Sequence, residues 1–214
     1  MNLIIGILIV ANVLLSIKGF KDLAFFNKYK FSVLDVKKGE KYRLFSSGFL
    51  HVDYIHLGFN MYALYLFSNS VLYYFSDLQY LLIYGLSLFA GNYLSLMIHK
   101  SNAYYSAVGA SGAVTGIVYS SIVLFPDMEL YLMFIPIPIK AYVFGIGYLF
   151  YSFYGMKKQL GNIGHTAHIG GAVTGYVLTL VFMPSVFQRN TLEVVLLAIP
   201  IIVLLILQKK NIFQ

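Results

Sequence analysis

The chain has 214 residues, of which 59% are hydrophobic and only 11% are charged, and its net charge is +7 at neutral pH. Soluble domains typically contain about 25% charged residues, so this composition argues against a soluble globular protein. The absence of cysteine excludes disulfides, thiol nucleophiles and thiolate metal sites. Because the basic residues lie between apolar segments, we expect them to face membrane lipid head groups and not nucleic acid.

Seven apolar segments are candidates to cross a membrane, which takes about 17–25 mainly apolar residues in a helix. They cover roughly residues 2–17, 50–69, 78–98, 110–126, 138–156, 166–184 and 191–207. The first has no basic leader and no small-residue cleavage site, so we interpret it as a retained helix and not as a signal peptide. The sequence therefore predicts an all-α, polytopic membrane helix bundle.

The only long connection, residues 18–46, mixes basic and aromatic side chains. This mixture is typical of a folded element that lies half-inserted at the membrane surface. Its basic residues are Lys18, Lys21, Lys28, Lys30, Lys37, Lys38, Lys41 and Arg43.

Polar residues inside the predicted spans are costly in lipid and therefore need a reason. In the second span, His56 and Asn60 share one helix face at a spacing of four residues. The fourth span opens with Gly109-Ala110-Ser111-Gly112, and Gly116 follows Gly112 at small-xxx-small spacing. This spacing predicts a face on which another helix packs closely.

The sixth span contains His168, followed by Gly171 and Gly175 on the same helix face. If this glycine face docks on the start of the fourth span, His168 comes beside Ser111. A serine hydroxyl is a weak nucleophile unless a neighbouring base takes its proton, and histidine is suited to do so near neutral pH. We therefore predict that Ser111 and His168 form a nucleophile–base pair.

Acyl transfer also needs donors that face the developing oxyanion. Ser111 begins a helix, so the helix itself leaves its N–H unpaired at the positive end of the dipole. His56 and Asn60 would add two side-chain donors if the second span lies alongside. An orienting carboxylate is not evident, since the nearest acidic residue, Asp53, lies at the mouth of the second span. The sequence thus indicates a dyad.

Each of these features also has a structural interpretation. A Gly-x-Ser-Gly string in a membrane helix more often serves packing, and polar residues in spans commonly bond to a neighbouring helix. The tight turn of soluble serine hydrolases is excluded, because it would need glycine where Ala113 stands. The remaining histidines lie near span ends, where we expect interfacial positions; they are His51, His99 and His165.

Together these motifs resemble those of the rhomboid family of intramembrane serine proteases. The resemblance covers roughly residues 1–184, and the motifs are specific in their order and spacing. The matching residues are Tyr42 and Arg43 in the first loop, His51, His56 and Asn60 in the second span, GASG at 109–112 and AHIGGAVTG at 167–175.

The resemblance implies a role for each matched residue. Ser111 is the implied nucleophile and His168 the general base and acid. The oxyanion and substrate-binding group is then His56, Asn60 and Gly109, together with the Ser111 amide. The remaining matches are implied structural supports, namely Tyr42, Arg43, His51, Gly112, Gly116, Gly171 and Gly175.

The resemblance also implies an architecture and a substrate class. Residues 1–184 would form a six-helix core with a water-filled cavity and a fifth helix that gates substrate access, and residues 185–214 an extra transmembrane helix and tail. Substrates would be single-span membrane proteins with a helix that is unstable near the cut, because the scissile backbone must first leave its hydrogen-bonded helix. We expect no metal and no cofactor, and a location in the plasma membrane.

Two features depart from the simple pattern. Many relatives place an aromatic ring where Thr115 stands, to pack on the catalytic imidazole, and we expect Tyr119 or a tyrosine of the fifth span to replace it. Alternating the spans also puts every Lys and Arg except Lys140 and Arg189 on one side. Charge counting would make that side cytoplasmic, whereas the family pattern, which we follow, puts the first loop and the catalytic mouth outside.

Two other functions remain as alternatives. One is a non-catalytic relative that binds membrane proteins as a chaperone or adaptor, although such relatives usually lose the serine or the histidine. The other is a small transporter with His56, Asn60 and His168 along a polar path. The sparse polar residues and the lack of repeat symmetry argue against transport.

Overall fold

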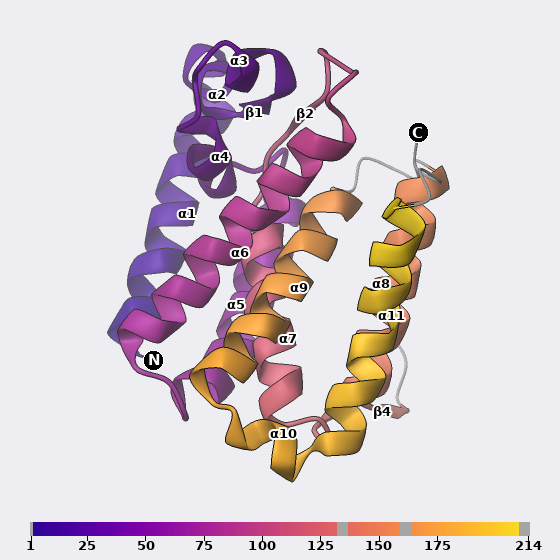
Figure 1. The fold of residues 1–214 in the computed structure, drawn as a ribbon. Coiled ribbons are helices and arrows are strands. Elements are labelled where there is room, and N and C mark those ends of the chain that lie inside the picture. Colours follow the sequence, from indigo (N-terminus) through magenta and orange to yellow (C-terminus); the bar gives the residue numbers. More distant parts are fainter. Residues whose placement is uncertain (1, 132–136, 159–163, 210–214) are drawn as a thin grey trace.

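The computed structural model describes residues 2–131, 137–158 and 164–209, and its long elements are all α-helices. These helices pack into one bundle (Figure 1). Each overlaps one predicted span, so the predicted helix bundle is observed. The long helices are α1 (Leu3–Lys21), α5 (Tyr54–Leu72), α6 (Asp77–Ile98), α7 (Ser111–Leu124), α8 (Ala141–Lys158), α9 (His165–Phe182) and α11 (Thr191–Lys209).

Length and composition identify two of the described helices as able to cross a membrane by themselves, α1 and α6. Helix α7 and the Thr191–Leu204 part of α11 are apolar but shorter. The topology of seven spans therefore stays a prediction. The last residues of the predicted tail, 210–214, lie outside the described residues.

The predicted interfacial loop is folded, and α1 extends further into it than expected. Its short elements are α2 (Leu23–Tyr29), β1 (Phe31–Ser32), α3 (Val33–Lys37), α4 (Arg43–Ser46) and the 3-10 turn η1 (Ser47–Phe49). Strand β1 pairs antiparallel with β2 (Ser106–Ala107), with Phe31 opposite Ala107. This pairing ties the loop to the connection that leads into α7.

Three further short elements complete the chain in its second half. Strands β3 (Glu129–Tyr131) and β4 (Pro138–Lys140) form an antiparallel pair between α7 and α8. Helix α10 (Ser185–Arg189) joins α9 to α11. The two strand pairs were not predicted, because runs of two or three residues leave no readable alternation of apolar and polar side chains.

Helix α7 is the centre of the bundle. Of its 14 residues, 12 are buried. In Figure 1, α9 and α6 lie directly beside it. A helix that is covered all round must be apolar or small-residue on every face, which fits the run Ser111–Leu124.

Helices α7 and α9 meet backbone to backbone through the two glycine faces. A Cβ atom on Gly171 would lie 2.8 Å from the carbonyl carbon of Gly112, and one on Gly175 would lie 2.7 Å from Gly116 Cα. Real Cβ atoms essentially never approach other atoms so closely. The sixth predicted span therefore docks on the start of the fourth, as its small-xxx-small spacing indicates.

Hydroxyl and amide side chains join the helices inside the bundle. Thr166 of α9 is hydrogen-bonded to Ser95 of α6 at 2.7 Å, and Thr179 Oγ1 lies 2.7 Å from Ser120 Oγ of α7. The Asn12 amide of α1 donates to the Tyr84 hydroxyl of α6 at 3.2 Å. Such bonds satisfy polar groups that lipid would leave unpaired, and they fix which helix faces meet.

Helix α11 packs against α8, which extends the bundle on one side (Figure 1). A Cβ on Gly145 of α8 would lie 2.9 Å from Leu197 Cδ2 of α11. The Tyr176 hydroxyl of α9 donates to the Val194 carbonyl at 3.0 Å. The C-terminal helix is thus attached to both α8 and α9.

Replacing Gly175 with Ala should destabilise the bundle by about 1–3 kcal/mol, because the added methyl group would have to push α9 away from the α7 backbone. Thermal unfolding of the purified protein in detergent would show this as a lower midpoint. Gly85→Ala is the matched control, since Gly85 lies within α6 and a Cβ there meets nothing within 4 Å. Alanine is the better helix former, so the control should be neutral or slightly stabilising. Equal midpoints for the two variants would contradict the close α7–α9 contact.

Candidate active site

Ser111 lies at the first position of α7, where no side chain caps the helix. By contrast, side chains cap the starts of α1, α5 and α6. The first N–H groups of α7 therefore keep their donors for another acceptor, at the positive end of the helix dipole. Gly109, just before this start, has a φ of +136°, a conformation that strongly favours glycine.

The imidazole of His56 and the hydroxyl of Ser111 face the same small space beside Gly109. A Cβ on Gly109 would lie 3.1 Å from His56 Nε2 and 3.6 Å from Ser111 Oγ. Any other residue at 109 would fill this space. The Nδ1 atom of His56 is buried without a hydrogen-bond partner in the described part of the chain. The structure thus brings His56 of α5 to the candidate nucleophile.

Asn60 lies one turn further along α5 and is buried, with 6% of its surface exposed. Its amide Nδ2 donates to the His56 carbonyl at 2.9 Å. One amide hydrogen is therefore used within its own helix, and the described contacts do not link Asn60 to Ser111. The structure places Asn60 below His56 on the same face without bringing it to the nucleophile.

Asp53 is the acidic residue that the sequence left as the nearest orienting carboxylate. In the structure, its Oδ1 accepts a hydrogen bond of 2.7 Å from the backbone N–H of His56 and caps α5. N-capping is a common use of aspartate and explains why α5 begins at Tyr54. Asp53 therefore stabilises the helix that carries His56.

His168 lies in the first turn of α9, and its ring stacks on Tyr148 of α8 with centroids 6.0 Å apart and an interplanar angle of 23°. The Tyr148 hydroxyl is hydrogen-bonded to His168 Nδ1 at 2.9 Å. A tyrosine of α8, the fifth predicted span, is one of the two replacements that the sequence suggested for the ring absent at Thr115. The other, Tyr119, donates its hydroxyl to the Gly145 carbonyl.

Three contacts link the surroundings of His168 to the first turn of α7. The Tyr148 oxygen lies 3.5 Å from Thr115 Oγ1, and Thr115 in turn donates to the Ser111 carbonyl at 2.7 Å. Next to His168, the Ala167 carbonyl oxygen would lie 3.3 Å from a Cβ on Gly112. Within the described residues no hydrogen bond joins Ser111 Oγ to the His168 ring, and such bonds often tighten only when substrate is present.

His51 connects the loop before Ser111 to α1. Its ring is completely buried, and its Nε2 accepts the Ala110 N–H at 3.4 Å. The neutral ring must then carry its proton on Nδ1, which donates to Ser16 Oγ at 2.8 Å. The Ser16 hydroxyl donates to the Phe49 carbonyl at 3.0 Å. This sequence of bonds holds the turn at Ala110 against α1.

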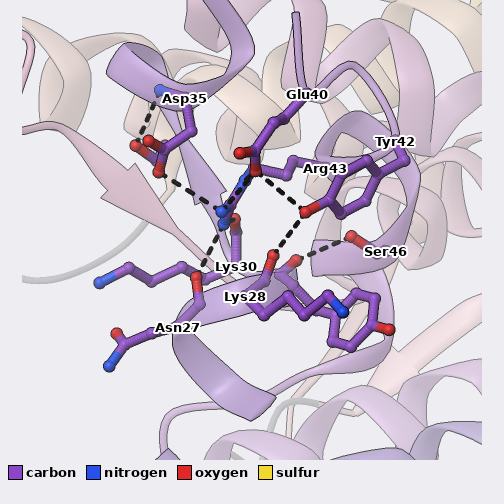
Figure 2. A network of polar contacts seen from close by, with 10 residues as sticks. Asn27, Lys28, Lys30, Asp35, Glu40, Tyr42, Arg43 and Ser46 are labelled. Carbon is purple, nitrogen blue, oxygen red and sulfur yellow. Dashed lines mark hydrogen bonds and ion pairs between the residues drawn. The ribbon is translucent and has the colours of Figure 1, made fainter. Parts of the chain in front are cut away.

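Arg43 organises the segment between α1 and α5 (Figure 2). Arg43 is buried, with 6% of its surface exposed. Its guanidinium forms ion pairs with Glu40 at 2.7 Å and with Asp35 at 3.5 Å. It also donates to the backbone carbonyls of Asn27 and Lys30 at 2.8 and 2.9 Å. One side chain therefore joins α2, α3 and α4, which fits the delocalised, multi-donor chemistry of arginine.

These contacts shift the pKa values of Glu40 and Tyr42. The hydrogen bond from Arg43, followed by that from the Tyr42 hydroxyl, lowers the pKa of Glu40 below its ordinary value of 4.5. Partial desolvation of the exposed Tyr42 side chain, and then its hydrogen bond to Glu40, raise the pKa of that phenol. Folding therefore favours the charged carboxylate.

The Arg43 network reaches the candidate site through Ser47. The Ser47 hydroxyl donates to the Arg43 carbonyl at 2.8 Å, and Asn92 of α6 donates to Ser47 Oγ at 3.1 Å. The Ser47 carbonyl accepts the Gly109 N–H at 3.0 Å. The folded segment thus supports the turn on which Ser111 depends.

Sequence reasoning placed His51 and His165 near the membrane interface without foreseeing that the protein itself covers their side chains. His51 is fully buried and His165 is 3% exposed. The His165 ring lies 6.4 Å from that of His168 and 5.5 Å from that of Tyr151 on α8. Gly155 of α8 makes room for it, since a Cβ there would overlap the imidazole. The sequence near the end of a span does not show whether another helix will cover the side chains there.

Comparison with known proteins agrees with the motif pattern. A family model described as Rhomboid domain matches residues 38–185. The chain is 29% identical to RHOMBOID-like protein 12, mitochondrial, of Arabidopsis thaliana over 192 residues, which is 82% of this chain and 57% of the relative. It is 30% identical to Rhomboid protein 1, mitochondrial, of Saccharomyces cerevisiae, over 63% of this chain and 40% of the relative.

A third relative is RHOMBOID-like protein 4 of Arabidopsis thaliana, which is 31% identical over 70% of this chain and 37% of its own length. The chain therefore spans between 37% and 57% of the length of these relatives. The family match over residues 38–185 includes Ser111, His168 and His56.

Acid should weaken the fold of residues 22–46. The pKa of Glu40 is lower in the folded protein than when unfolded, so its stabilising effect is present above about pH 4.5 and is lost as the pH falls through the lowered value. Limited proteolysis should cut this segment faster below that range. The Glu40→Gln variant should be cut faster than the wild type at neutral pH and at the same rate in acid. The Glu193→Gln variant, changed on α11, should be cut at the wild-type rate at every pH. A Glu40→Gln difference that persists unchanged in acid would contradict this role.

His51→Phe should destabilise the protein by about 1–3 kcal/mol, because it keeps a ring in the space but leaves the buried Ala110 N–H without its acceptor. Denaturant unfolding in detergent measures this change. His99→Phe is the matched control: His99 is half-buried, stacks on Tyr105 with centroids 3.7 Å apart, and no hydrogen bond of its ring is among the described contacts. The control should change stability by less than about 0.5 kcal/mol. Similar losses for both variants would show that the His51 bonds contribute little.

Proposed function

Because the chain belongs to the rhomboid family, we propose that it is an intramembrane serine endopeptidase with Ser111 as nucleophile and His168 as general base and acid. One observation carries the proposal. Ser111 begins an uncapped helix, His56 of α5 faces the space beside it, and His168 of α9 is linked to the same helix through Tyr148 and Thr115. This combination supports acyl transfer, which needs a hydroxyl, a base and charge-stabilising donors near one another.

In the proposed reaction, Ser111 Oγ attacks the carbonyl carbon of the scissile peptide bond while its proton passes to His168 Nε2. His168 then gives this proton to the nitrogen of the leaving amine as the C–N bond breaks. A water molecule attacks the resulting acyl-enzyme, with His168 first taking a proton from the water and then returning it to Ser111. Atoms and charges balance without a metal or a cofactor.

The negative charge of the tetrahedral intermediate would lie between the start of α7 and His56. The Ser111 N–H and the helix dipole favour an anion there, and His56 Nε2 lies near the same space. We propose Asn60 as a further donor through its second amide hydrogen, which the His56 carbonyl does not use. Gly109 keeps the space open for the substrate carbonyl.

The proposed substrates are membrane proteins with a single transmembrane segment. A peptide bond must leave its helix before it can be attacked, so a substrate helix with weak hydrogen bonding near the cut is favoured. We propose that residues 1–184 are the catalytic core and residues 185–214 an accessory helix and tail. The family match over residues 38–185 supports the end of this core.

The chain is a membrane protein, and its compartment is part of the proposal. The sequence alone led us to expect the plasma membrane. Two of the matched relatives are named as mitochondrial, which makes a mitochondrial membrane the alternative location.

Ser111→Ala should abolish cleavage of a single-span reporter in proteoliposomes, with a fall of at least roughly a thousand-fold, because the nucleophile is lost. Ser121→Ala is the matched control, since Ser121 is a buried serine of the same helix whose hydroxyl makes no hydrogen bond in the described residues. The control should cleave at the wild-type rate. Both variants should unfold at temperatures close to that of the wild type.

The result can overturn the proposal in two ways. Cleavage that persists in Ser111→Ala would exclude Ser111 as the nucleophile. A wild-type protein that is folded, cleaves no reporter and is never labelled by a fluorophosphonate probe would instead favour a non-catalytic member of the family.

A further inference from the structure

We infer that Tyr148 of α8 is the positioning residue of the candidate dyad: its phenol oxygen accepts the Nδ1–H of His168 and so keeps Nε2 free for the Ser111 proton. This inference rests on the proposed function. It gives Tyr148 the orienting role that a carboxylate has in a serine–histidine–aspartate triad. Tyr148 does not touch the reacting atoms and acts only through His168.

Two contacts define how Tyr148 holds the imidazole. Their rings stack at an angle of 23°, and the hydroxyl lies 2.9 Å from Nδ1. Stacking restricts the tilt of the ring, and the hydrogen bond restricts its rotation about the Cβ–Cγ bond. The Tyr148 ring is itself packed against Phe144 at 5.8 Å and Tyr119 at 6.3 Å between centroids.

The direction that we infer for this hydrogen bond is compatible with its neighbours. The Thr115 hydroxyl donates its only hydrogen to the Ser111 carbonyl at 2.7 Å. It can therefore only accept a hydrogen bond from Tyr148. In this direction the phenol hydrogen points to Thr115 Oγ1, 3.5 Å away, and the phenol oxygen presents a lone pair to Nδ1. A neutral histidine that donates from Nδ1 has an unprotonated Nε2, which is the state a general base needs.

No acidic side chain competes for this role among the described residues. Asp53, the candidate from sequence, caps α5, and the ion pairs of Asp35, Glu40 and Asp127 all lie outside the bundle centre. A neutral phenol holds the tautomer without adding a buried charge, which would be costly inside a membrane protein.

The orientation of His168 in this arrangement also depends on a third helix, α8. Ser111 and His168 belong to α7 and α9, which glycine contacts hold together, whereas Tyr148 belongs to α8. A movement of α8 away from α9 would release Nδ1 without separating the two candidate catalytic residues. The readiness of the dyad is therefore linked to the position of α8.

Tyr148→Phe tests the inference, because it keeps the stacked ring and removes only the hydroxyl. We expect the turnover rate on a transmembrane reporter, and the rate of fluorophosphonate labelling at saturation, to fall about 10- to 100-fold, as for the loss of a hydrogen bond to a group that becomes charged. The KM for the reporter should stay within about twofold of wild type, since Tyr148 acts on the base and not on binding.

A spectroscopic measurement separates orientation from packing. In protein labelled with ¹⁵N-histidine, the His168 signal of the wild type should be that of an Nδ1–H tautomer, and in Tyr148→Phe it should shift toward a mixture. Tyr176→Phe is the matched control, because it removes a buried phenol that bonds Val194 at 3.0 Å, away from the dyad. The control should leave both the rate and the tautomer unchanged.

The outcomes distinguish this inference from the proposed function. An unchanged rate in Tyr148→Phe, with an active wild type and an inactive Ser111→Ala, would overturn the inference alone. A lower rate with an unchanged His168 tautomer would also overturn it, since the loss would then come from packing. Absence of activity in the folded wild type would refute the proposed function, and the His168 tautomer would still decide whether Tyr148 orients the ring.

Discussion

The backbone contact between α7 and α9 is the constraint on which the rest of the structure depends. Gly112 and Gly116 face Gly171 and Gly175 so closely that no side chain fits between them. Without a hydrophobic force to bring helices together in lipid, such close packing supplies much of the association energy. Ser111 directly precedes Gly112 in α7, and His168 lies about one turn before Gly171 in α9. The same glycines thus hold together the two helices that carry Ser111 and His168.

A second set of contacts surrounds this pair and holds the turn before Ser111. His51 bonds this turn to Ser16 of α1, and Ser47 connects it to the Arg43 network of the folded segment. The uncapped start of α7 leaves donors unpaired, which costs stability unless the surroundings hold the backbone in place. The His51 and Ser47 contacts therefore hold the start of α7 in place while its first N–H groups stay unpaired.

Much of the fold followed from apolar length and small-residue spacing, because both are local properties of a helix. The spans predicted around Ser111 and His168 match α7 and α9 within a few residues, and the docking of their glycine faces is observed. The pairing of β1 with β2 and the burial of His51 and His165 were not foreseen. The strand pairing and the burial of His51 depend on partners far away in the chain, Ala107 for Phe31 and Ser16 for His51, and neither partner has a distinguishing pattern.

The sequence by itself determined that this is a membrane helix bundle and which residues are candidates for chemistry. Polar side chains in apolar spans are costly enough to stand out, so Ser111, His168, His56 and Asn60 were visible at once. Only the tertiary structure decided their surroundings: Asp53 caps a helix, Asn60 bonds within its own helix, and Tyr148 takes the place beside His168. The physical reason is that helix periodicity places a residue on a face, whereas hydrogen-bond partners depend on which faces meet across the bundle.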